Sequence, residues 1–319
     1  MKDKLLIKNA VFWMAMFFIM GAFQSSGEIS SNNSEGDTLY VGCGGFECYS
    51  DIQSAINDAK SGDTVFVYDD SSPYYENLII DKSITLIGEN RETTIIDGSR
   101  YGNVVSVSAD GVNISQFTIQ NGGKGCSGLT LTDYSDHNII SNNTITLNSW
   151  DGVSLFYSSY NTIRDNIISS NSDGIYICRY CNNNNILANT ILENNYYGIF
   201  IQSSNNDNIF HSNNLIKNSQ NADDGGNNIW DNEWNGNYWD DYEKIYPNAK
   251  KIWLTGIWNI PYDIPSGSNP DRYPLFKPYV ESKESEFNLL PMRLSRIFEQ
   301  FLTLKQTFPQ DGCLLKTFK

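Results

Sequence analysis

The sequence predicts an all-β protein, a right-handed parallel β-helix (solenoid), and a repeat of asparagines is the first observation behind this prediction. Three series of asparagines recur between residues 138 and 218 with steps of 23, 23 and 24 residues. The series are Asn138, Asn161, Asn184 and Asn208; Asn143, Asn166, Asn189 and Asn213; and Asn148, Asn171, Asn194 and Asn218. A fixed period of this length is typical of stacked repeats that share one continuous core.

A glycine followed by an alternating run opens each repeat and is the second observation. The runs GLTLT, GVSLF, GIYIC and GIFIQ begin at Gly128, Gly152, Gly174 and Gly198. Such alternation sends one set of side chains inward and the other outward, as in a strand. The predicted inward residues are Leu129, Leu131, Val153, Leu155, Ile175, Ile177, Ile199 and Ile201.

The asparagines are predicted to be structural. Equivalent residues of successive coils lie about 4.8 Å apart, so each series stacks as a ladder of amides. Inward amides at a turn satisfy backbone groups that the corner leaves without partners. Since every coil repeats these residues, they do not mark one catalytic position.

Residues 1–27 read as a signal peptide: Lys2, Lys4 and Lys8 precede an apolar run over 10–23, and Ser25 and Gly27 suit a processing site. An uncleaved membrane anchor is the alternative. The chain holds 37 acidic and 22 basic residues, a balance that disfavours nucleic acid and favours cations as partners. The predicted localisation is secreted, either extracellular or at the cell surface.

The N-terminal part of the exported chain is expected to close one end of the solenoid. Residues 28–48 form a leader with a small disulfide loop between Cys43 and Cys48. The parallel β-helix covers 49–235, with strands from residue 63. A capping helix precedes them, in which Ser50 and Gln53 have capping-box spacing. Its predicted buried face consists of Ile52, Ala55, Ile56 and Ala59, with Gly62 as the helix stop.

The C-terminal end is predicted to be closed by aromatic side chains and an irregular segment. The cap covers 236–280, and its Pro/Gly-bearing part wraps the end without regular structure. The expected plug residues are Trp230, Trp234, Tyr238, Trp239 and Tyr242. Residues 281–319 have apolar positions at helical spacing, which predicts an amphipathic tail helix.

Several segments resemble a known group of repeat proteins. They are TLYVG, YSDIQSAINDAKSGDTVFVY, NTIRDNIISSNSDGIYI, GNYWDDY and IPYDIPSGSNPDRYPLFKPY, within residues 38–280. They are similar to secreted right-handed β-helix proteins of the NosD type and of the carbohydrate-binding and sugar-hydrolysing repeat group. The resemblance implies an extracytoplasmic β-helix. Where such proteins carry an aspartate-rich, calcium-like loop, this chain has EKIYPNAKKIWLTGIWN, so no calcium site is expected at that loop.

Candidate metal ligands are sparse in this sequence. Copper sites use Met, His or Cys clusters. The exported chain has His137, His211 and Met292, and the histidines flank turns on different coils. We therefore predict no metal centre and no cofactor, with calcium at acidic residues as the open alternative.

Cysteines and paired carboxylates are the next candidates. The CRYC motif of Cys178 and Cys181 predicts a local disulfide or pairing with Cys126 or Cys313, with zinc as the alternative. Asp151 and Asp173 precede equivalent glycines, so their carboxylates stack on adjacent coils. Such a pair serves glycoside hydrolysis or calcium binding, and an aspartate before glycine also simply suits a turn. No complete catalytic motif is present, which leaves the question of enzymatic activity open.

Exposed aromatic residues on the glycine-led strands give the predicted binding face. The candidates are Trp150, Phe156, Tyr176, Arg179, Tyr196 and Phe200. Aromatic rings with polar anchors suit sugar stacking, and cover by the tail helix is the alternative. We therefore predict a carbohydrate-binding or surface-interaction module with a polysaccharide or cell-surface glycan as partner. A polysaccharide lyase, glycoside hydrolase or epimerase, and a NosD-like copper-handling accessory protein, are the alternatives. Membrane contact is expected through the N-terminal segment or the tail helix.

Overall fold

The structure is a computed structural model that describes residues 36–44 and 48–280. The predicted signal peptide and the predicted tail helix, with Met292 and Cys313, lie outside the described residues. No helix in the described part is long and apolar enough to cross a membrane.

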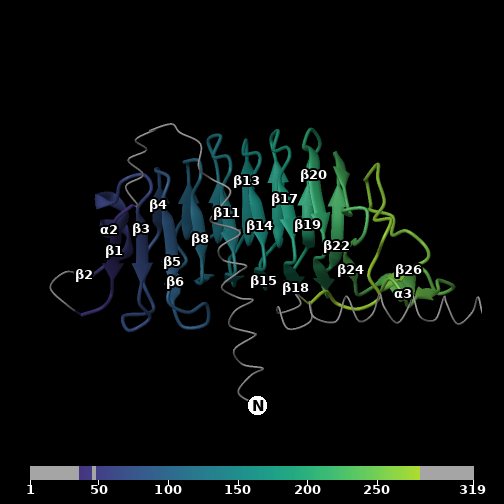
Figure 1. The fold of residues 1–319 in the computed structure, drawn as a ribbon, viewed down its shortest axis with the longest axis horizontal. Helices are drawn as coiled ribbons and strands as arrows, with labels where there is room; N and C mark the ends of the chain where they lie inside the picture. The colour runs from purple at the N-terminus through teal and green to yellow at the C-terminus, as the bar shows by residue number, and fades with distance from the viewer. Residues whose placement is uncertain (1–35, 45–47, 281–319) are drawn as a thin grey trace, which may run out of the picture. The chain divides into compact units, whose positions relative to one another are not determined.

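Three parallel sheets make up the solenoid (Figure 1). The ten-stranded sheet consists, in order, of β2 (Cys48–Tyr49), β1 (Thr38–Val41), β3 (Thr64–Val67), β5 (Thr85–Gly88), β8 (Asn113–Ser115), β11 (Ile139–Ser141), β14 (Thr162–Arg164), β17 (Asn185–Leu187), β20 (Asn206–His211) and β23 (Asn227–Ile229). One seven-stranded sheet, here called the glycine-led sheet, consists of β4 (Leu78–Ile80), β7 (Val105–Val107), β10 (Leu129–Leu131), β13 (Val153–Phe156), β16 (Ile175–Cys178), β19 (Tyr197–Ile201) and β22 (Gln220–Asp224). The other consists of β6 (Ile95–Asp97), β9 (Thr118–Gln120), β12 (Thr144–Thr146), β15 (Ile167–Ser169), β18 (Thr190–Leu192), β21 (Asn214–Ile216) and β24 (Tyr238–Trp239).

Each regular coil contributes one strand to each sheet, and the predicted fold class is confirmed. The solenoid has about eight turns. Leu129 pairs with Val153, Val153 with Ile175, and Ile175 with Ile199. All eight predicted inward residues of these strands are fully buried in one continuous core. The short strands stay in register because any slip by one residue would turn these apolar side chains outward.

The asparagines form the three predicted ladders. Asn166 illustrates the pattern: its Oδ1 accepts from the backbone N of Asn143 at 2.9 Å and from the Nδ2 of Asn143 at 3.3 Å. Its Nδ2 donates to the carbonyl of Ile140 at 2.9 Å and to Oδ1 of Asn189 at 3.0 Å. Each amide therefore joins three coils and satisfies buried backbone groups at the corner.

A residue in the left-handed backbone region precedes each asparagine of the three series between residues 138 and 218, and the sequence does not show this. Ala188 (φ 56°) precedes Asn189, and Glu193 (φ 54°) precedes Asn194. Side-chain-bearing residues adopt this region at a cost, because Cβ crowds the backbone. The ladder hydrogen bonds fix the following amide in place and so hold these corners in shape.

All three ladders end in carboxylates at the C-terminal end. In the first, Asn228 Nδ2 donates to Asp224 at 2.7 Å. In the second, the backbone N of Asn237 donates to Asp271 at 2.7 Å. In the third, Asn221 takes the final amide and donates to Asp240 at 3.0 Å. The backbone N of each ladder asparagine between residues 138 and 218, except Asn218, donates toward this end to the side-chain oxygen of the next asparagine, and the carboxylates accept where the series stops.

The N-terminal end is covered by helix α2 (Ile52–Asp58), which packs against β1, β3 and β4. Its N-cap is Asp51, whose side chain accepts from Ser54 N, so the expected capping box at Ser50 is wrong. The Glu76 carboxylate accepts from the backbone N of Ile52 and Gln53 at 2.8 and 2.9 Å, which satisfies two further helix-end donors. The first strands, β1 and β2, lie within the stretch that the sequence assigns to the leader.

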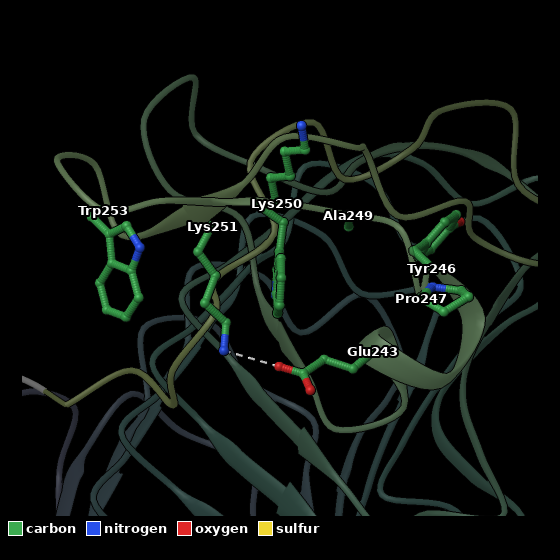
Figure 2. Close-up of a pocket in the computed structure, with 8 residues that line it drawn as sticks. Glu243, Tyr246, Pro247, Ala249, Lys250, Lys251 and Trp253 are labelled. Carbon is green, nitrogen blue, oxygen red and sulfur yellow. Dashed lines mark ion pairs between the residues drawn. The ribbon is translucent and has the colours of Figure 1, made fainter.

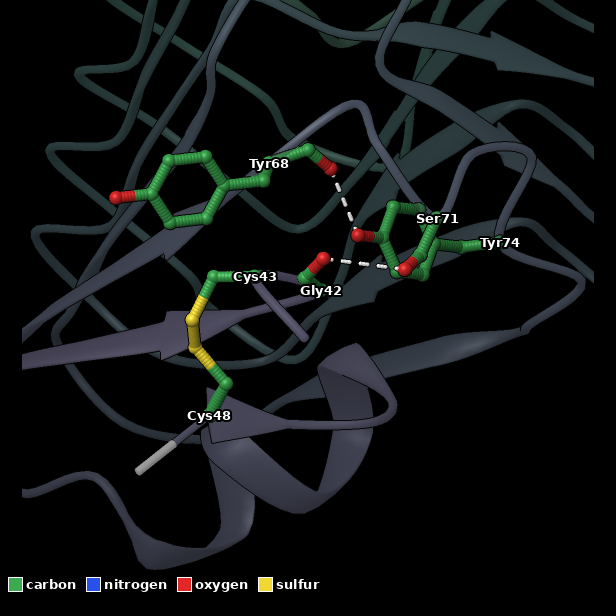
Figure 3. The surroundings of a disulfide bond; sticks show 6 residues. All are labelled: Gly42, Cys43, Cys48, Tyr68, Ser71 and Tyr74. Carbon is green, nitrogen blue, oxygen red and sulfur yellow. Dashed lines mark hydrogen bonds between the residues drawn. A yellow bond between two sulfur atoms is a disulfide. The ribbon is translucent and has the colours of Figure 1, made fainter. Parts of the chain in front are cut away.

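A disulfide joins Cys43 to Cys48 beside this end, with Cα atoms 5.9 Å apart (Figure 3). Near it, the Ser71 hydroxyl donates to the carbonyl of Gly42 at 3.1 Å. The Tyr74 hydroxyl donates to the carbonyl of Tyr68 at 2.7 Å. These bonds tie the loop after β3 to the first strand.

Aromatic rings close the C-terminal end. Trp230 stacks on Phe210 at 4.4 Å between centroids, and Trp239 stacks on Tyr262 at 4.1 Å. Trp234 was expected in this plug but is 79% exposed, because it lies in the turn between β23 and β24. The cap also contains helix α3 (Tyr242–Ile245) and an antiparallel hairpin, β25 (Lys251–Ile252) with β26 (Ile257–Trp258). The sequence did not predict either element.

Candidate functional site

The outer face of the glycine-led sheet carries a column of side chains that changes character along the solenoid. Strand pairing places its members one coil apart in the order Ile79, Ser106, Thr130, Ser154, Tyr176, Phe200 and Asp223. Small polar residues thus give way to aromatic rings and then to an acid. The aromatic part of this face is the candidate site.

Four rings in the middle of this face form what we call the aromatic stack. Tyr176 and Phe200 stack at 5.6 Å between centroids with 18° between their planes. Tyr197 stacks on Phe200 at 4.7 Å, and Phe156 meets Tyr176 edge to face at 6.0 Å. Because the rings cover one another's faces, the stack presents mainly edges to the outside. It is therefore a rigid floor and a weaker platform for a sugar ring than the sequence suggested.

Trp150 and Tyr196 stand exposed along one margin of the stack. They belong to one column, since Ser172 N donates to the carbonyl of Trp150 at 2.7 Å and Tyr196 N donates to the carbonyl of Ser172 at 2.9 Å. Two strand spacings, about 10 Å, thus separate their backbones. Trp150 is 49% and Tyr196 is 64% exposed. Both side chains are therefore open to solvent, in a column that follows the direction of the solenoid.

A second aromatic row follows the opposite end of the same strands. Tyr134, Tyr157 and Tyr180 lie in successive coils with centroid distances of 5.6 and 6.4 Å. The Arg179 guanidinium lies 6.0 Å from the Tyr157 ring centroid. Tyr134 and Tyr180 were not among the predicted site residues, although each follows a glycine-led strand at a similar offset.

The predicted acidic pair also lies on this sheet. The backbone carbonyls of Asp151 and Asp173 accept from Gly128 and Gly152, which confirms that they occupy equivalent places in adjacent coils. Asp151 is almost completely buried: its Oδ2 accepts from the Ser127 hydroxyl at 3.4 Å, and its Oδ1 has no partner among the described residues. Asp173 accepts from Tyr197 N at 2.9 Å.

Burial, and then the nearby Asp173, raise the pKa of Asp151 to about 8. Burial also raises the pKa of Asp173. A carboxyl that keeps its proton near neutral pH is suited to general-acid chemistry. The Asp151 side chain is closed off from solvent, however, and a general acid must reach the substrate within hydrogen-bond distance. The geometry therefore favours a structural role for Asp151 at the turn.

We expect Asp151→Asn to flatten the pH dependence of stability. Because the pKa of Asp151 is higher in the folded than in the unfolded chain, its proton stabilises the fold below about pH 4, and this contribution is lost as pH rises through about 8. The melting temperature of the wild type should fall by about 5 °C or more relative to the variant between about pH 5 and about pH 9. Calorimetry on both proteins measures this difference. The exposed control Asp81→Asn should follow the wild type, and a wild-type slope in Asp151→Asn would refute the assignment.

The predicted pairings of Cys178 or Cys181 with each other or with Cys126 are absent, since all three cysteines are free thiols within the described residues. The predicted alternative with Cys313 lies outside the described residues. Cys178 ends β16 and is outside the core cluster, whereas Cys181 belongs to the core. The Cys181 thiol accepts from Ser158 N at 3.3 Å and donates to the carbonyl of Cys178 at 3.1 Å. The two sulfurs thus take different sides of the chain, and burial raises the pKa of Cys181 to about 12.

The histidines lie apart: His137 is in the turn before β11 and His211 ends β20. His137 is exposed and stacks on Tyr160 at 5.3 Å between centroids. His211 Nδ1 lies 3.2 Å from the Ser212 hydroxyl, and burial lowers its pKa. The described ranges contain no group of three His, Cys, Asp or Glu residues placed to hold a metal ion.

Three stacked parallel sheets, a continuous apolar core and internal amide ladders define this chain as a parallel β-helix protein. The chain belongs to the NosD family: the family model described as periplasmic copper-binding protein (NosD) matches residues 30–244. A search of curated proteins finds no match.

Solved structures with similar folds are more distant. They include ORF18 of Geobacillus virus E2 (19% identity, TM-score 0.46, 52% of this chain and 38% of that chain). A double mutant of the periplasmic alginate epimerase AlgG matches at 15% identity and TM-score 0.40, over 60% of this chain and 44% of that chain. Pectin methylesterase PemA from Erwinia chrysanthemi matches at 14% identity and TM-score 0.39, over 56% of this chain and 69% of that chain. This chain spans less than half the length of the first two.

The family description names copper, so the side chains that could ligate copper in this chain matter. Copper prefers clustered thiolate, thioether or imidazole ligands. Here burial raises the pKa of the Cys181 thiol, and His137, in the turn before β11, lies three coils from His211, which ends β20. The described residues therefore do not fit a copper site.

Proposed function

We propose that this protein is an extracytoplasmic carbohydrate-binding β-helix, and that the margin of the glycine-led sheet binds a polysaccharide chain. The observation that carries the proposal is the pair of open rings, Trp150 and Tyr196, in one column beside the aromatic stack. The predicted signal peptide and the family description support a location outside the cytoplasm.

The arrangement suits an extended chain of sugars. Rings repeated at the spacing of coils offer successive apolar faces, and sugar rings stack on such faces through their C–H groups. The aromatic stack supports this margin as a rigid floor, so little side-chain entropy is lost on binding. Arg179 and the Tyr157 row supply polar contacts on the other margin for hydroxyl or carboxylate groups.

Replacing Trp150 and Tyr196 together by alanine is expected to weaken polysaccharide binding by about tenfold or more, because both open faces are lost. Affinity electrophoresis on plant, algal and microbial polysaccharides measures the change, and circular dichroism reports the fold. The matched control is Trp234→Ala, which removes an exposed tryptophan elsewhere. Equal binding by the double variant and the control would refute the proposal.

The Tyr176→Ala/Phe200→Ala variant distinguishes the role of the aromatic stack from that of the exposed rings Trp150 and Tyr196. We expect it to lower the melting temperature, because Tyr197 and Phe156 lose their ring partners, and to weaken binding through the disturbed floor. Product analysis on the same polysaccharides tests the alternative of a lyase, hydrolase or epimerase. Products formed by the wild type and lost in Asp173→Asn would favour that alternative.

A further inference from the structure

The hairpin of β25 and β26 has two large apolar side chains at its tip. Lys251 pairs with Trp258 across the strands, and the turn is closed by Gly256 N donating to the carbonyl of Ile252 at 3.0 Å. In the tip itself, Trp253 is 73% and Leu254 is 83% exposed. Turn tips are normally Gly, Asn, Asp or Ser, and exposed apolar groups that cluster mark a contact surface.

Contacts at the base of the hairpin and with the cap hold this tip in place. The Trp253 ring meets the Phe276 ring edge to face at 5.0 Å. The Lys251 amine lies 4.8 Å from the ring centroid of Trp258 and 3.0 Å from the Glu243 carboxylate. The tip is therefore a supported projection, with its aromatic and aliphatic groups already placed before any partner arrives.

A positively charged hollow of about 560 Å³ adjoins the tip (Figure 2). Its lining residues are Glu243, Tyr246, Pro247, Ala249, Lys250, Lys251, Trp253 and Trp258. Lys251 is paired with Glu243, whereas the Lys250 side chain extends away from that pair and takes part in none of the ion pairs of the described residues. A free ammonium beside an apolar tip favours an anionic partner locally, against the net charge of −15 of the whole chain.

We propose that this hairpin tip docks on the surface of an anionic phospholipid bilayer. Trp253 lies at the level of the headgroups, Leu254 enters the boundary of the acyl chains, and Lys250 pairs with lipid phosphate in the hollow. Tryptophan is favoured at this interface, and lysine keeps its charge among headgroups while its stem covers apolar surface. This contact goes beyond glycan binding and uses the cap, not the glycine-led sheet.

The composition of the tip favours a bilayer over other partners. Trp253 has an aromatic ring for a sugar, but the most exposed residue here is the aliphatic Leu254, which only an apolar partner buries favourably. A second copy of the chain would pair through strands of only two residues, which is far below the area of a stable protein interface. One apolar tip with one nearby cation gives weak, reversible membrane binding.

The experiment is sedimentation of the full chain with vesicles of phosphatidylcholine alone or mixed with phosphatidylglycerol. Trp253→Ala/Leu254→Ser should bind the mixed vesicles about tenfold more weakly than wild type, because the inserted groups are lost. Lys250→Glu should weaken binding to the mixed vesicles and leave binding to phosphatidylcholine unchanged. Trp234→Ala, which removes a tryptophan of similar exposure, should bind as the wild type does.

Three results would overturn the proposal. The wild type could fail to bind either vesicle, or the double variant could bind mixed vesicles as the wild type does, which would assign binding to another segment. The third is loss of polysaccharide binding in Trp253→Ala/Leu254→Ser with vesicle binding unchanged, which would make the hollow a glycan site. Circular dichroism verifies that each variant is folded before it is scored.

Discussion

Replacing Asn166 by leucine is expected to lower the melting temperature of the β-helix by more than about 10 °C. The leucine has similar volume but cannot exchange hydrogen bonds. It removes the side-chain hydrogen bonds to the N and Nδ2 of Asn143, the carbonyl of Ile140 and Oδ1 of Asn189. Asn189 Oδ1 keeps the backbone N of residue 166 and Asn143 Nδ2 keeps the carbonyl of Ile114, so the Asn143 N and the Ile140 carbonyl lose most. A buried group that loses its partner costs roughly 1–3 kcal/mol, which gives a loss on the order of 3–6 kcal/mol.

The control for this experiment is Asn195→Leu, at an exposed asparagine in a neighbouring coil. It should change the melting temperature by only about 1–2 °C, since exposed substitutions are usually close to neutral. Differential scanning calorimetry on both variants makes the comparison. Similar melting temperatures for Asn166→Leu and the control would mean that the ladder does not stabilise the fold.

The Gly174→Ala variant is expected to destabilise the protein by several kcal/mol. A Cβ at this position would lie 2.5 Å from the carbonyl oxygen of Gly198 and 2.5 Å from Cγ2 of Ile191. The first contact is with backbone of the next coil, so relief requires two strands to separate. Overpacking of a well-packed core costs about 1–3 kcal/mol, and backbone overlap adds to that.

Gly256→Ala measures the cost of a left-handed backbone conformation alone, without a steric clash. Gly256 has φ +82° with open space around its Cα, so alanine there adds backbone strain without overlap. We expect a loss of about 1 kcal/mol, well below that of Gly174→Ala. Urea unfolding of both variants gives the two free energies of unfolding. A ranking in the opposite order would show that the coils can separate at little cost.

The alternation in the sequence was sufficient to orient the strands. Because side chains alternate strictly along a strand, the run after Gly174 fixed Ile175 and Ile177 as inward and Tyr176 as outward. The asparagine spacing likewise predicted the ladders. Asn237, 24 residues after Asn213, continues the second ladder. Its spacing predicts this position, but the aromatic residues around it break the repeat pattern, so it was not included in the predicted series.

Other features depend on neighbours that no local pattern reveals. The glycines recur because the next coil's carbonyl and the third ladder's amide occupy the space of a side chain, as at Gly152 beside Asn171. The left-handed corners hold residues such as Ala188 and Glu193, which have no turn preference. Their conformation is imposed by stacking, so propensity does not predict it.

The candidate site was likewise predictable from the sequence only in part. The sequence placed Tyr176 and Phe200 on the outside, one coil apart, and the register agrees. It could not show that their faces cover each other, because that depends on side-chain torsions set by Tyr197 and Phe156. The sequence thus proposed Trp150 and Tyr196 as exposed rings together with the stacked ones, and only the structure separates the two groups.

Because each coil makes the same ladder hydrogen bonds to the coils before and after it, the solenoid can change length by whole coils. Between Asn138 and Asn218, the backbone N of each ladder asparagine donates to the side-chain oxygen of its equivalent in the next coil. Carboxylates such as Asp271 accept the last of these hydrogen bonds. A coil duplicated within this range would therefore fit between its neighbours while both caps stay unchanged. The margin that carries Trp150 and Tyr196 would lengthen in steps of about 4.8 Å, so the number of sugar units it spans can change by adding or removing whole coils.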